Sequence, residues 1–195
     1  IFDKLDFKPE IISFDKNDFK NEINIDYKKD VFGNLSSLLK CFKIAKEKTN
    51  DLVFFLEDDY LHKTSLLEEM ILTYERISSQ TKKELILVPS DYPFLYMNER
   101  NTSILAGSHR HWQTLDKVLC SFLTSKKMID NYWNNFLLTC QNHNNPIEIH
   151  LNKICEKEIC LSPLPSLSIH VANANSIFGV SPYIDIKHEW EKNKI

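Results

Sequence analysis

The sequence is poor in glycine and has no long apolar run, and each of these absences excludes a class of protein. Only 3 glycines occur among 195 residues, so neither a Walker loop nor a GxGxxG dinucleotide-binding turn can form. No apolar run approaches the roughly 20 residues that a membrane-spanning helix needs. The formal net charge of −3 gives no electrostatic case for binding nucleic acid. Any bound nucleotide must therefore be held by something other than a glycine-rich loop.

The 5 cysteines have irregular spacing and form no CxxC pair, which argues against a structural zinc site. Most of them lie beside apolar residues, and free cysteine is among the most buried residue types. We therefore expect buried free thiols at the cysteine positions, which are Cys41, Cys120, Cys140, Cys155 and Cys160.

The start of the chain, Ile1-Phe2-Asp3-Lys4, contains neither an initiator methionine nor a signal peptide. Hydrophobic residues make up 43% and charged residues 26%, as in an ordinary soluble protein, and the length suits one domain. These features favour a cytoplasmic protein, and they leave open that an N-terminal segment is missing.

Short apolar runs predict several strands in the first half of the chain. They lie at 11–14, 52–56 and 85–88, with a weaker candidate at 23–27. The run at 52–56 does not alternate with polar residues, which is typical of a strand covered on both faces, as in a parallel sheet.

Two amphipathic helices are expected between these strands. Apolar residues at helical spacing predict one helix from Asn34 to about Asn50 and another from Ser65 onward. Ser65 and Glu68 have the spacing of a capping box. Strands and helices that alternate with short links predict an α/β sandwich.

The second half of the chain is less regular. It has β-like stretches between 104 and 124 and a helical pattern at 126–141. Pro146 is expected to start another helix, because proline is favourable at the first helical position. The stretch 159–184 contains three prolines and predicts strand and loop, and the highly charged end, 187–195, predicts an exposed tail.

Three adjacent carboxylates, Glu57-Asp58-Asp59, directly follow the apolar run at 52–56. In open α/β sheets, ligands bind beyond the carboxyl ends of the strands. Like charges this close repel one another, and a divalent cation such as Mg²⁺ or Mn²⁺ removes the conflict. The same side chains could instead cap the next helix or face water, since aspartate is common in turns. The residues alone leave both interpretations open.

The stretch LVFFLEDDYL at 52–61 resembles the apolar strand and DxD-type motif of GT-A glycosyltransferases, of the family 2-like type that builds bacterial polysaccharides. The helix expected at 34–48 resembles the helix that leads into this strand. The segment PSLSIH at 165–170 resembles the later segment that brings a histidine to the metal. The resemblance covers most of the chain from about residue 10 to 185. It implies an α/β fold with a Rossmann-like mixed sheet flanked by helices.

The resemblance also implies how the chain is organised. Residues 1–195 form a single glycosyltransferase domain. Residues 1–100 make the nucleotide-sugar and metal half, 101–185 the less regular acceptor-side half, and 186–195 a charged tail. The chain starts near the end of the first helix of such a domain, so either this is a piece of a longer protein or the nucleotide site is built differently.

The resemblance assigns roles to the acidic cluster. Mn²⁺ or Mg²⁺ is bound by Asp59, Glu57 and His170 and bridges the diphosphate of a UDP- or GDP-sugar. Asp15 and Asp58, together with Glu57 and Asp59, contact the nucleotide-sugar, with Asp58 or Glu57 facing the ribose or donor sugar. Without the resemblance, His170 alone is more often a hydrogen-bonded structural histidine. The sugar is transferred to a glycan or another acceptor hydroxyl, in the cytoplasm or in peripheral association with the inner face of the membrane.

An inverting transfer needs a carboxylate that takes the proton of the acceptor hydroxyl. Glu148, in the first turn of the helix expected after Pro146, is the leading candidate. A capping box between Asn145 and Glu148 would explain the glutamate equally well. Asp91, which follows the strand expected at 85–88, and Asp116 are further candidates.

The motif His109-Arg110-His111-Trp112 allows two interpretations. Aromatic rings stack on sugars and arginine binds phosphate, so the motif could contact a substrate. It could equally be a solvated hairpin anchored by its tryptophan. Asn173 and Asn175 follow His170 closely enough to lie near the site.

Two other functions remain open. One is another metal-dependent phosphoryl- or nucleotidyl-transfer enzyme, and the other is a non-catalytic domain of the same fold.

Overall fold

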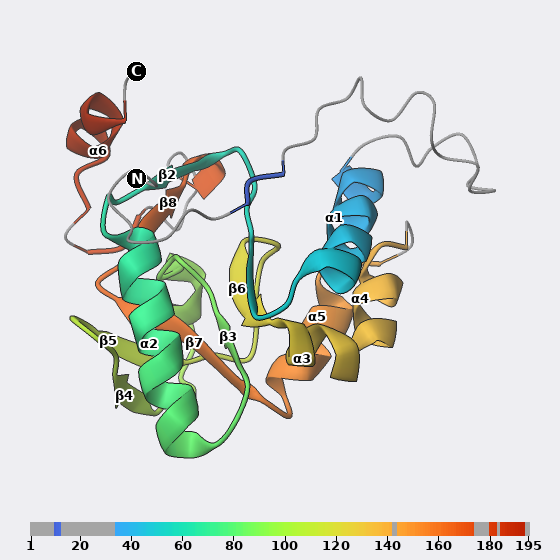
Figure 1. Ribbon diagram of the computed structural model, residues 1–195. Coiled ribbons are helices and arrows are strands. Elements are labelled where there is room, and N and C mark those ends of the chain that lie inside the picture. Colours follow the sequence, from blue (N-terminus) through green and yellow to red (C-terminus); the bar gives the residue numbers. More distant parts are fainter. Residues whose placement is uncertain (1–9, 13–33, 142–143, 174–179, 183, 194–195) are drawn as a thin grey trace.

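The structure is a computed structural model that describes residues 10–12, 34–141, 144–173, 180–182 and 184–193. Within these residues a mixed six-stranded sheet is flanked by helices (Figure 1). The predicted α/β class is therefore confirmed, whereas the GT-A arrangement stays a prediction. The strands, in their order across the sheet, are β1 (Leu52–Phe55), β6 (Phe122–Ser125), β3 (Leu85–Leu87), β7 (Ile159–Leu164), β5 (His111–Thr114) and β4 (Ile104–Ala106).

All neighbouring strands of this sheet are antiparallel except β3 and β7, which run parallel. A second, two-stranded antiparallel sheet pairs β2 (Tyr60–His62) with β8 (Ser168–His170). The helices are α1 (Asn34–Lys48), α2 (Leu66–Thr81), α3 (Lys126–Asn131), α4 (Trp133–Thr139), α5 (Ile149–Cys155) and α6 (Ile186–Lys192), and the 3-10 turns are η2 (Pro93–Tyr96) and η3 (Val171–Asn173).

The two faces of the sheet are covered by different helices. Successive residues of a strand point to opposite faces, and in β3 the side chain of Ile86 packs in the core formed with α1, α3, α4 and α5. Leu85 and Leu87 point the other way, into the core formed with α2. Figure 1 shows α2 on one side of the sheet and α1, α3, α4 and α5 together on the opposite side.

The α1 helix forms where the sequence predicts it, because its apolar residues repeat at helical spacing. Phe42 is fully buried, and its ring makes edge-to-face contacts with Phe55 and Phe136 at centroid distances of 5.0 and 4.9 Å. The contacts of these three rings pack α1 against β1 and α4.

The strand predicted at 52–56 exists, but its predicted parallel setting is wrong. Among the described strands β1 lies at one end of the sheet and pairs only with β6, antiparallel. The absence of alternating polar residues in β1 is explained by packing on both of its faces. Val53 and Phe55 pack toward the α1 side and Leu52 and Phe54 toward the α2 side, so both faces need apolar residues.

Several predicted helix boundaries are wrong. Ser65 makes no side-chain bond to the start of α2, so the capping box with Glu68 does not form. The single helix expected at 126–141 is two helices, because Tyr132 leaves the helical conformation with φ −116° and ψ 22°.

The helix expected from Pro146 begins at Ile149. The end of the chain, expected to be a tail, contains α6, whose first turn is capped by the Asp185 side chain accepting from the His188 N–H at 3.0 Å. The predicted strand at 11–14 lies only partly within the described residues, and that at 23–27 lies outside them.

The cysteine prediction is largely confirmed. All five thiols are free, and four are buried, whereas Cys41 is half-buried. None of the helices in the described ranges is long and apolar enough to cross a membrane.

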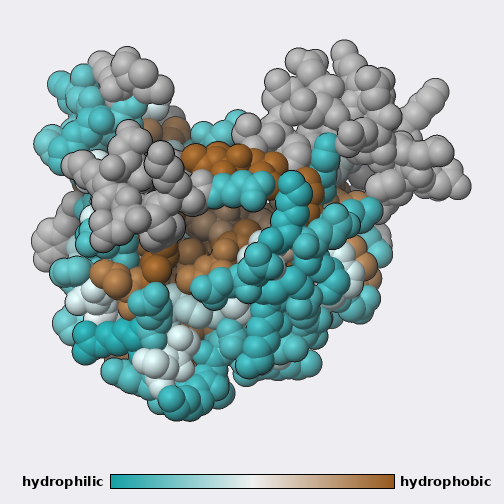
Figure 2. Space-filling view, viewed as in Figure 1, coloured by the Kyte–Doolittle hydropathy of each residue, from teal (hydrophilic) through white to brown (hydrophobic). Residues whose placement is uncertain are grey.

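In the space-filling view, the surface is hollowed between the part that carries α2 and the part that carries α1 (Figure 2). Hydrophobic residues line this hollow, and hydrophilic residues cover its sides. The segment between β1 and β2, which contains the acidic cluster, passes along the same side of the molecule.

Candidate functional site

Pairing between β2 and β8 brings the acidic cluster to His170. The register places Tyr60 opposite His170, so Asp59, one residue before Tyr60, lies beside the end of β8. The backbone N–H of Val171 donates to the carbonyl of Asp59 at 2.9 Å. This main-chain bond extends the pairing to Asp59 itself and fixes its position relative to His170.

The side chains of Asp59 and His170 are in direct contact. Nε2 of His170 lies 2.8 Å from Oδ2 of Asp59, with the imidazole 19% and the carboxylate 46% exposed. The other imidazole nitrogen, Nδ1, is buried and has no hydrogen-bond partner within the described part of the chain. The pair thus combines a fixed imidazole with a carboxylate that solvent and ligands can reach.

Glu57 is held by Ser121, a fully buried residue just before β6. The Glu57 N–H donates to Ser121 Oγ at 3.0 Å, and this hydroxyl donates to Glu57 Oε2 at 3.3 Å. Burial raises the pKa of the Glu57 carboxyl, and the charge of Asp59 raises it further, whereas His170 opposes the shift. Glu57 therefore lies within electrostatic reach of the Asp59–His170 pair, and Asp58 between them is exposed.

Glu148 is the N-cap residue of α5 but does not cap the helix with its side chain. The helix begins at Ile149, so the capping box between Asn145 and Glu148, the alternative to a catalytic role, does not form. The Glu148 Oε1 accepts from the thiol of Cys120 at 3.8 Å, a weak bond, and the charge of Glu148 contributes to the raised pKa of Glu57. Glu148 thus lies in the same region as the acidic cluster, and its carboxylate makes no hydrogen bond that caps α5.

Asp91 is a buried carboxylate in a polar network. Its Oδ1 accepts from the Tyr96 hydroxyl at 2.7 Å and from Gln113 Nε2 at 2.9 Å, and burial raises its pKa. Asp91 lines a pocket together with Ser168, His170 and Ser181. Its bonds to η2 and β5 already give it a structural role.

Asp116 was expected on a strand, but it is an exposed residue of the loop between β5 and β6. The backbone of Asn173 lies in η3, directly after β8. Its side chain, together with Asn175 and Asp15, lies outside the described residues.

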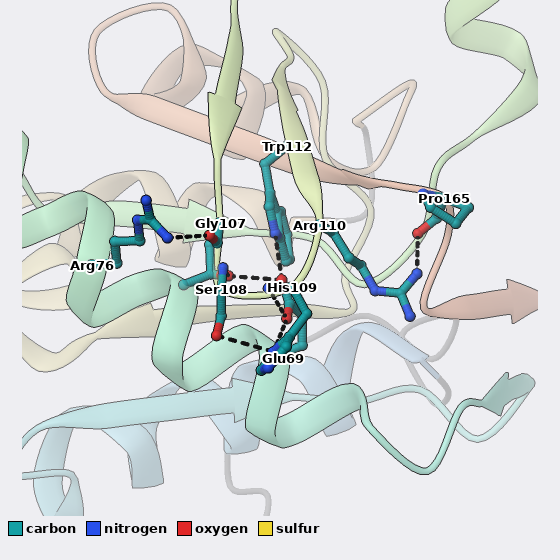
Figure 3. A network of polar contacts seen from close by, with 9 residues as sticks. Glu69, Arg76, Gly107, Ser108, His109, Arg110, Trp112 and Pro165 are labelled. Carbon is teal, nitrogen blue, oxygen red and sulfur yellow. Dashed lines mark hydrogen bonds and ion pairs between the residues drawn. The ribbon is translucent and has the colours of Figure 1, made fainter.

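The motif at 109–112 lies in a hairpin anchored by its tryptophan, so Trp112 is not available to stack on a sugar. Trp112 is fully buried, and its Nε1 donates to Oε1 of Glu69 at 3.1 Å. The carboxylate of Glu69 also accepts from the Thr73 hydroxyl at 3.0 Å and from the His109 N–H at 2.8 Å (Figure 3). Arg110 donates to the carbonyl of Pro165 at 2.8 Å.

Sequence reasoning missed Glu69, Ser121 and Tyr60. Glu69 follows Leu66 by three residues and precedes Thr73 by four, so it lies on the buried face of α2. That spacing could have identified it as a buried acid. The roles of Ser121 and Tyr60 depend on strand pairing, which leaves no local signal.

Asp59 and His170 fit two positions around a divalent cation. Neighbouring ligands of an octahedral ion with bonds of about 2.1 Å lie about 3 Å apart, close to the distance found between Oδ2 and Nε2. The described residues contain no group of three His, Cys, Asp or Glu side chains arranged to hold a metal, and Glu57 is bonded to Ser121 instead. Mg²⁺ in phosphate-binding sites is commonly held by one or two carboxylates, with substrate phosphates and water as the other ligands.

Comparisons of this chain with protein-family models, with curated proteins and with solved structures found no match.

Proposed function

We propose that this chain is a metal-dependent glycosyltransferase domain of the GT-A type, which moves a sugar from a nucleotide-sugar to a hydroxyl of a glycan or another acceptor. The observation that carries the proposal is the Asp59–His170 contact. These residues are 111 positions apart, and the pairing of β2 with β8 places a carboxylate and an imidazole together beyond the end of β1.

The chemistry required of the site follows from the charge that develops on the leaving diphosphate. A bound divalent cation supplies Lewis-acid stabilisation of that charge. Asp59 and His170 would bind it, and the diphosphate would complete its coordination. Glu57 lies beside this pair, and burial together with the charge of Asp59 raises the pKa of its carboxyl.

Glu148 is the residue best placed to accept a proton from the acceptor. In a single displacement, the acceptor oxygen bonds to the sugar carbon while the bond from that carbon to the phosphate oxygen breaks, and the carboxylate takes the hydroxyl proton. Its carboxylate is not used as a helix cap, and its charge acts on Glu57. Asp91 is less suited, because its Oδ1 already accepts two hydrogen bonds in a buried network.

Both halves of the chain contribute to this site. Glu57 and Asp59 come from the segment between β1 and β2, whereas Ser121, Glu148 and His170 come from the later half. A division into a donor half and an acceptor half is part of the proposal, as are the UDP- or GDP-sugar donor and a cytoplasmic location, with peripheral association at the inner face of the membrane.

The proposal is tested by thermal unfolding with UDP-, GDP- and CMP-sugars, each with and without Mn²⁺. We expect at least one of them to raise the melting temperature only when metal is present, because a ligand at 100 times its Kd stabilises the folded state by about 2.7 kcal/mol. Asp59→Ala should abolish this effect without changing the melting temperature of the ligand-free protein.

Glu68→Ala is the matched control, since it removes an exposed carboxylate on α2 that belongs to no part of the site. It should retain the metal-dependent stabilisation. Stabilisation by no nucleotide-sugar, or stabilisation that Asp59→Ala retains, would contradict the proposal. A response to nucleoside triphosphates alone would favour phosphoryl or nucleotidyl transfer instead.

A further inference from the structure

Three rings form a stacked row along the β2–β8 ribbon. The Tyr60 ring is nearly parallel to the imidazoles of His62 and His170, with centroid distances of 6.0 and 4.6 Å and interplanar angles of 5° and 8°. Tyr60 and His170 are directly opposite in the strand register, so their side chains share one face of the ribbon. The closest stack of the row is therefore the one that covers His170.

Within the residues that the structure describes, the imidazole of His170 makes one of the two hydrogen bonds that usually fix such a ring. A histidine that binds a metal or a proton typically donates its other nitrogen to a carboxylate, a carbonyl or water, and this bond sets the ring orientation. Here Nε2 faces Asp59, and Nδ1 is buried without a partner in the described segments. The described residues thus offer the ring one polar contact and one stacking contact.

Tyr60 is itself held rigidly. It is 7% exposed, and its hydroxyl lies 3.2 Å from the hydroxyl of Tyr92, which is 1% exposed. His62, which is also parallel to Tyr60, is fixed by a contact of 2.7 Å between its Nδ1 and Ser168 Oγ. Because Tyr60 is buried and its hydroxyl is fixed, its ring offers a rigid surface on which the imidazole of His170 stacks.

We propose that Tyr60 is a positioning residue, and that its stacked ring orients His170 so that Nε2 faces Asp59. The inference rests on the proposed function only for the metal that the pair would bind. The orientation itself is a property of the metal-free protein. The face of the Tyr60 ring orients the imidazole, and the Tyr60 hydroxyl fixes the position of the ring.

The test compares Tyr60→Leu and Tyr60→Met, which both remove the ring, with Tyr60→Phe, which keeps it. Tyr92→Phe is a control that removes the hydroxyl partner alone. Imidazole ¹⁵N shifts of His170 are recorded by NMR at one fixed pH without metal, and the Kd for Mn²⁺ is measured by calorimetry. The methionine side chain is unbranched and adapts to irregular space, so this variant provides the test if the leucine variant does not fold.

We expect Tyr60→Phe and Tyr92→Phe to keep the wild-type nitrogen shifts and a Kd for Mn²⁺ within about 2-fold. Loss of the ring should change the His170 shifts and weaken Mn²⁺ binding roughly 10-fold, the lower end of the loss seen when the support of a metal ligand is removed. Amide shifts of α1 and β3, which do not contain the substituted residue, should stay native-like in all variants, which excludes general unfolding as the cause.

The outcomes separate this inference from the proposed function. Unchanged His170 nitrogen shifts in both ring-deletion variants would overturn the positioning role, as would equal changes in Tyr60→Phe. If the wild-type protein binds no Mn²⁺ but ring deletion still alters the His170 shifts, the proposed metal chemistry fails and the positioning role stands.

Discussion

The indole Nε1 of Trp112 donates a hydrogen bond of 3.1 Å to the carboxylate of Glu69, and both residues are almost fully buried. This bond joins β5 to α2 across the sheet. The same carboxylate accepts from Thr73 and from the backbone of His109, so one acid satisfies donors of a helix, a turn and a strand. The close packing extends to Gly107, where a Cβ atom would lie only 2.3 Å from the Trp112 ring.

Replacing Glu69 by glutamine should destabilise the protein strongly. The amide is neutral, and its nitrogen cannot accept the hydrogen bonds of Trp112 and His109, so at least one buried donor loses its partner. We expect a loss of roughly 2–4 kcal/mol in the free energy of unfolding, measured by urea denaturation. Glu68→Gln changes the neighbouring exposed acid and should stay within about 0.5 kcal/mol of wild type. Similar values for the two variants would show that the buried network contributes little.

Replacing Phe42 by alanine should also be costly. The ring is fully buried against Phe55 and Phe136, and its removal leaves a cavity at the junction of α1, β1 and α4. A loss of about 3–5 kcal/mol is expected from equilibrium unfolding. Leu72→Ala, at a position of α2 that is 39% exposed, is the control and should cost much less. A small loss of stability in Phe42→Ala would mean that α1 shifts and fills the cavity left by the ring.

Much of the fold could be predicted from apolar periodicity. The repeat through Leu38, Leu39 and Phe42 locates α1, and the apolar runs locate β1 and β3. The arrangement of the strands could not be predicted, because it depends on pairing between distant segments. Leu52 pairs with Ser125, and no local pattern distinguishes this antiparallel end strand from a parallel one inside the sheet.

The candidate site could be predicted only in part, for a related reason. The family resemblance predicts Asp59 and His170 as site residues, and the structure brings them into contact. No sequence pattern identifies the side chains that support them. Ser121 bonds to Glu57 because of the β1–β6 register, and Tyr60 stacks on His170 because of the β2–β8 register. Such roles follow from tertiary structure and not from residue type or spacing.

The stability of the protein should fall in mild acid because of His62. Burial lowers the pKa of its imidazole from 6.5 to about 4, so the folded protein keeps it neutral where the unfolded chain binds a proton. The neutral His62 therefore makes its full contribution to the free energy of unfolding above pH 6.5, and this contribution declines as the pH falls toward 4. At pH 5 the loss is about 2 kcal/mol, since 1 pKa unit corresponds to about 1.4 kcal/mol.

The measurement is the free energy of urea unfolding at pH 7.5 and at pH 5. In wild type the free energy of unfolding should be lower at pH 5 than at pH 7.5. In His62→Gln this decrease should be smaller by about 2 kcal/mol. His111→Gln, at an exposed position of β5, serves as the control and should behave like wild type. An unchanged pH dependence in His62→Gln would show that another group causes the acid sensitivity.

Glu148→Gln should abolish sugar transfer while leaving the donor site intact. The side chain does not cap α5, so its loss should change the free energy of unfolding by no more than about 0.5 kcal/mol. Because the amide cannot take the proton of the acceptor hydroxyl, turnover should fall by roughly 100-fold or more, whereas metal-dependent binding of the nucleotide-sugar should persist. Glu156→Gln, an exposed acid at the other end of the same helix, is the matched control and should leave turnover unchanged. Normal turnover in Glu148→Gln would remove this residue from the chemistry, and Asp91, which shares a pocket with His170, would become the carboxylate to test.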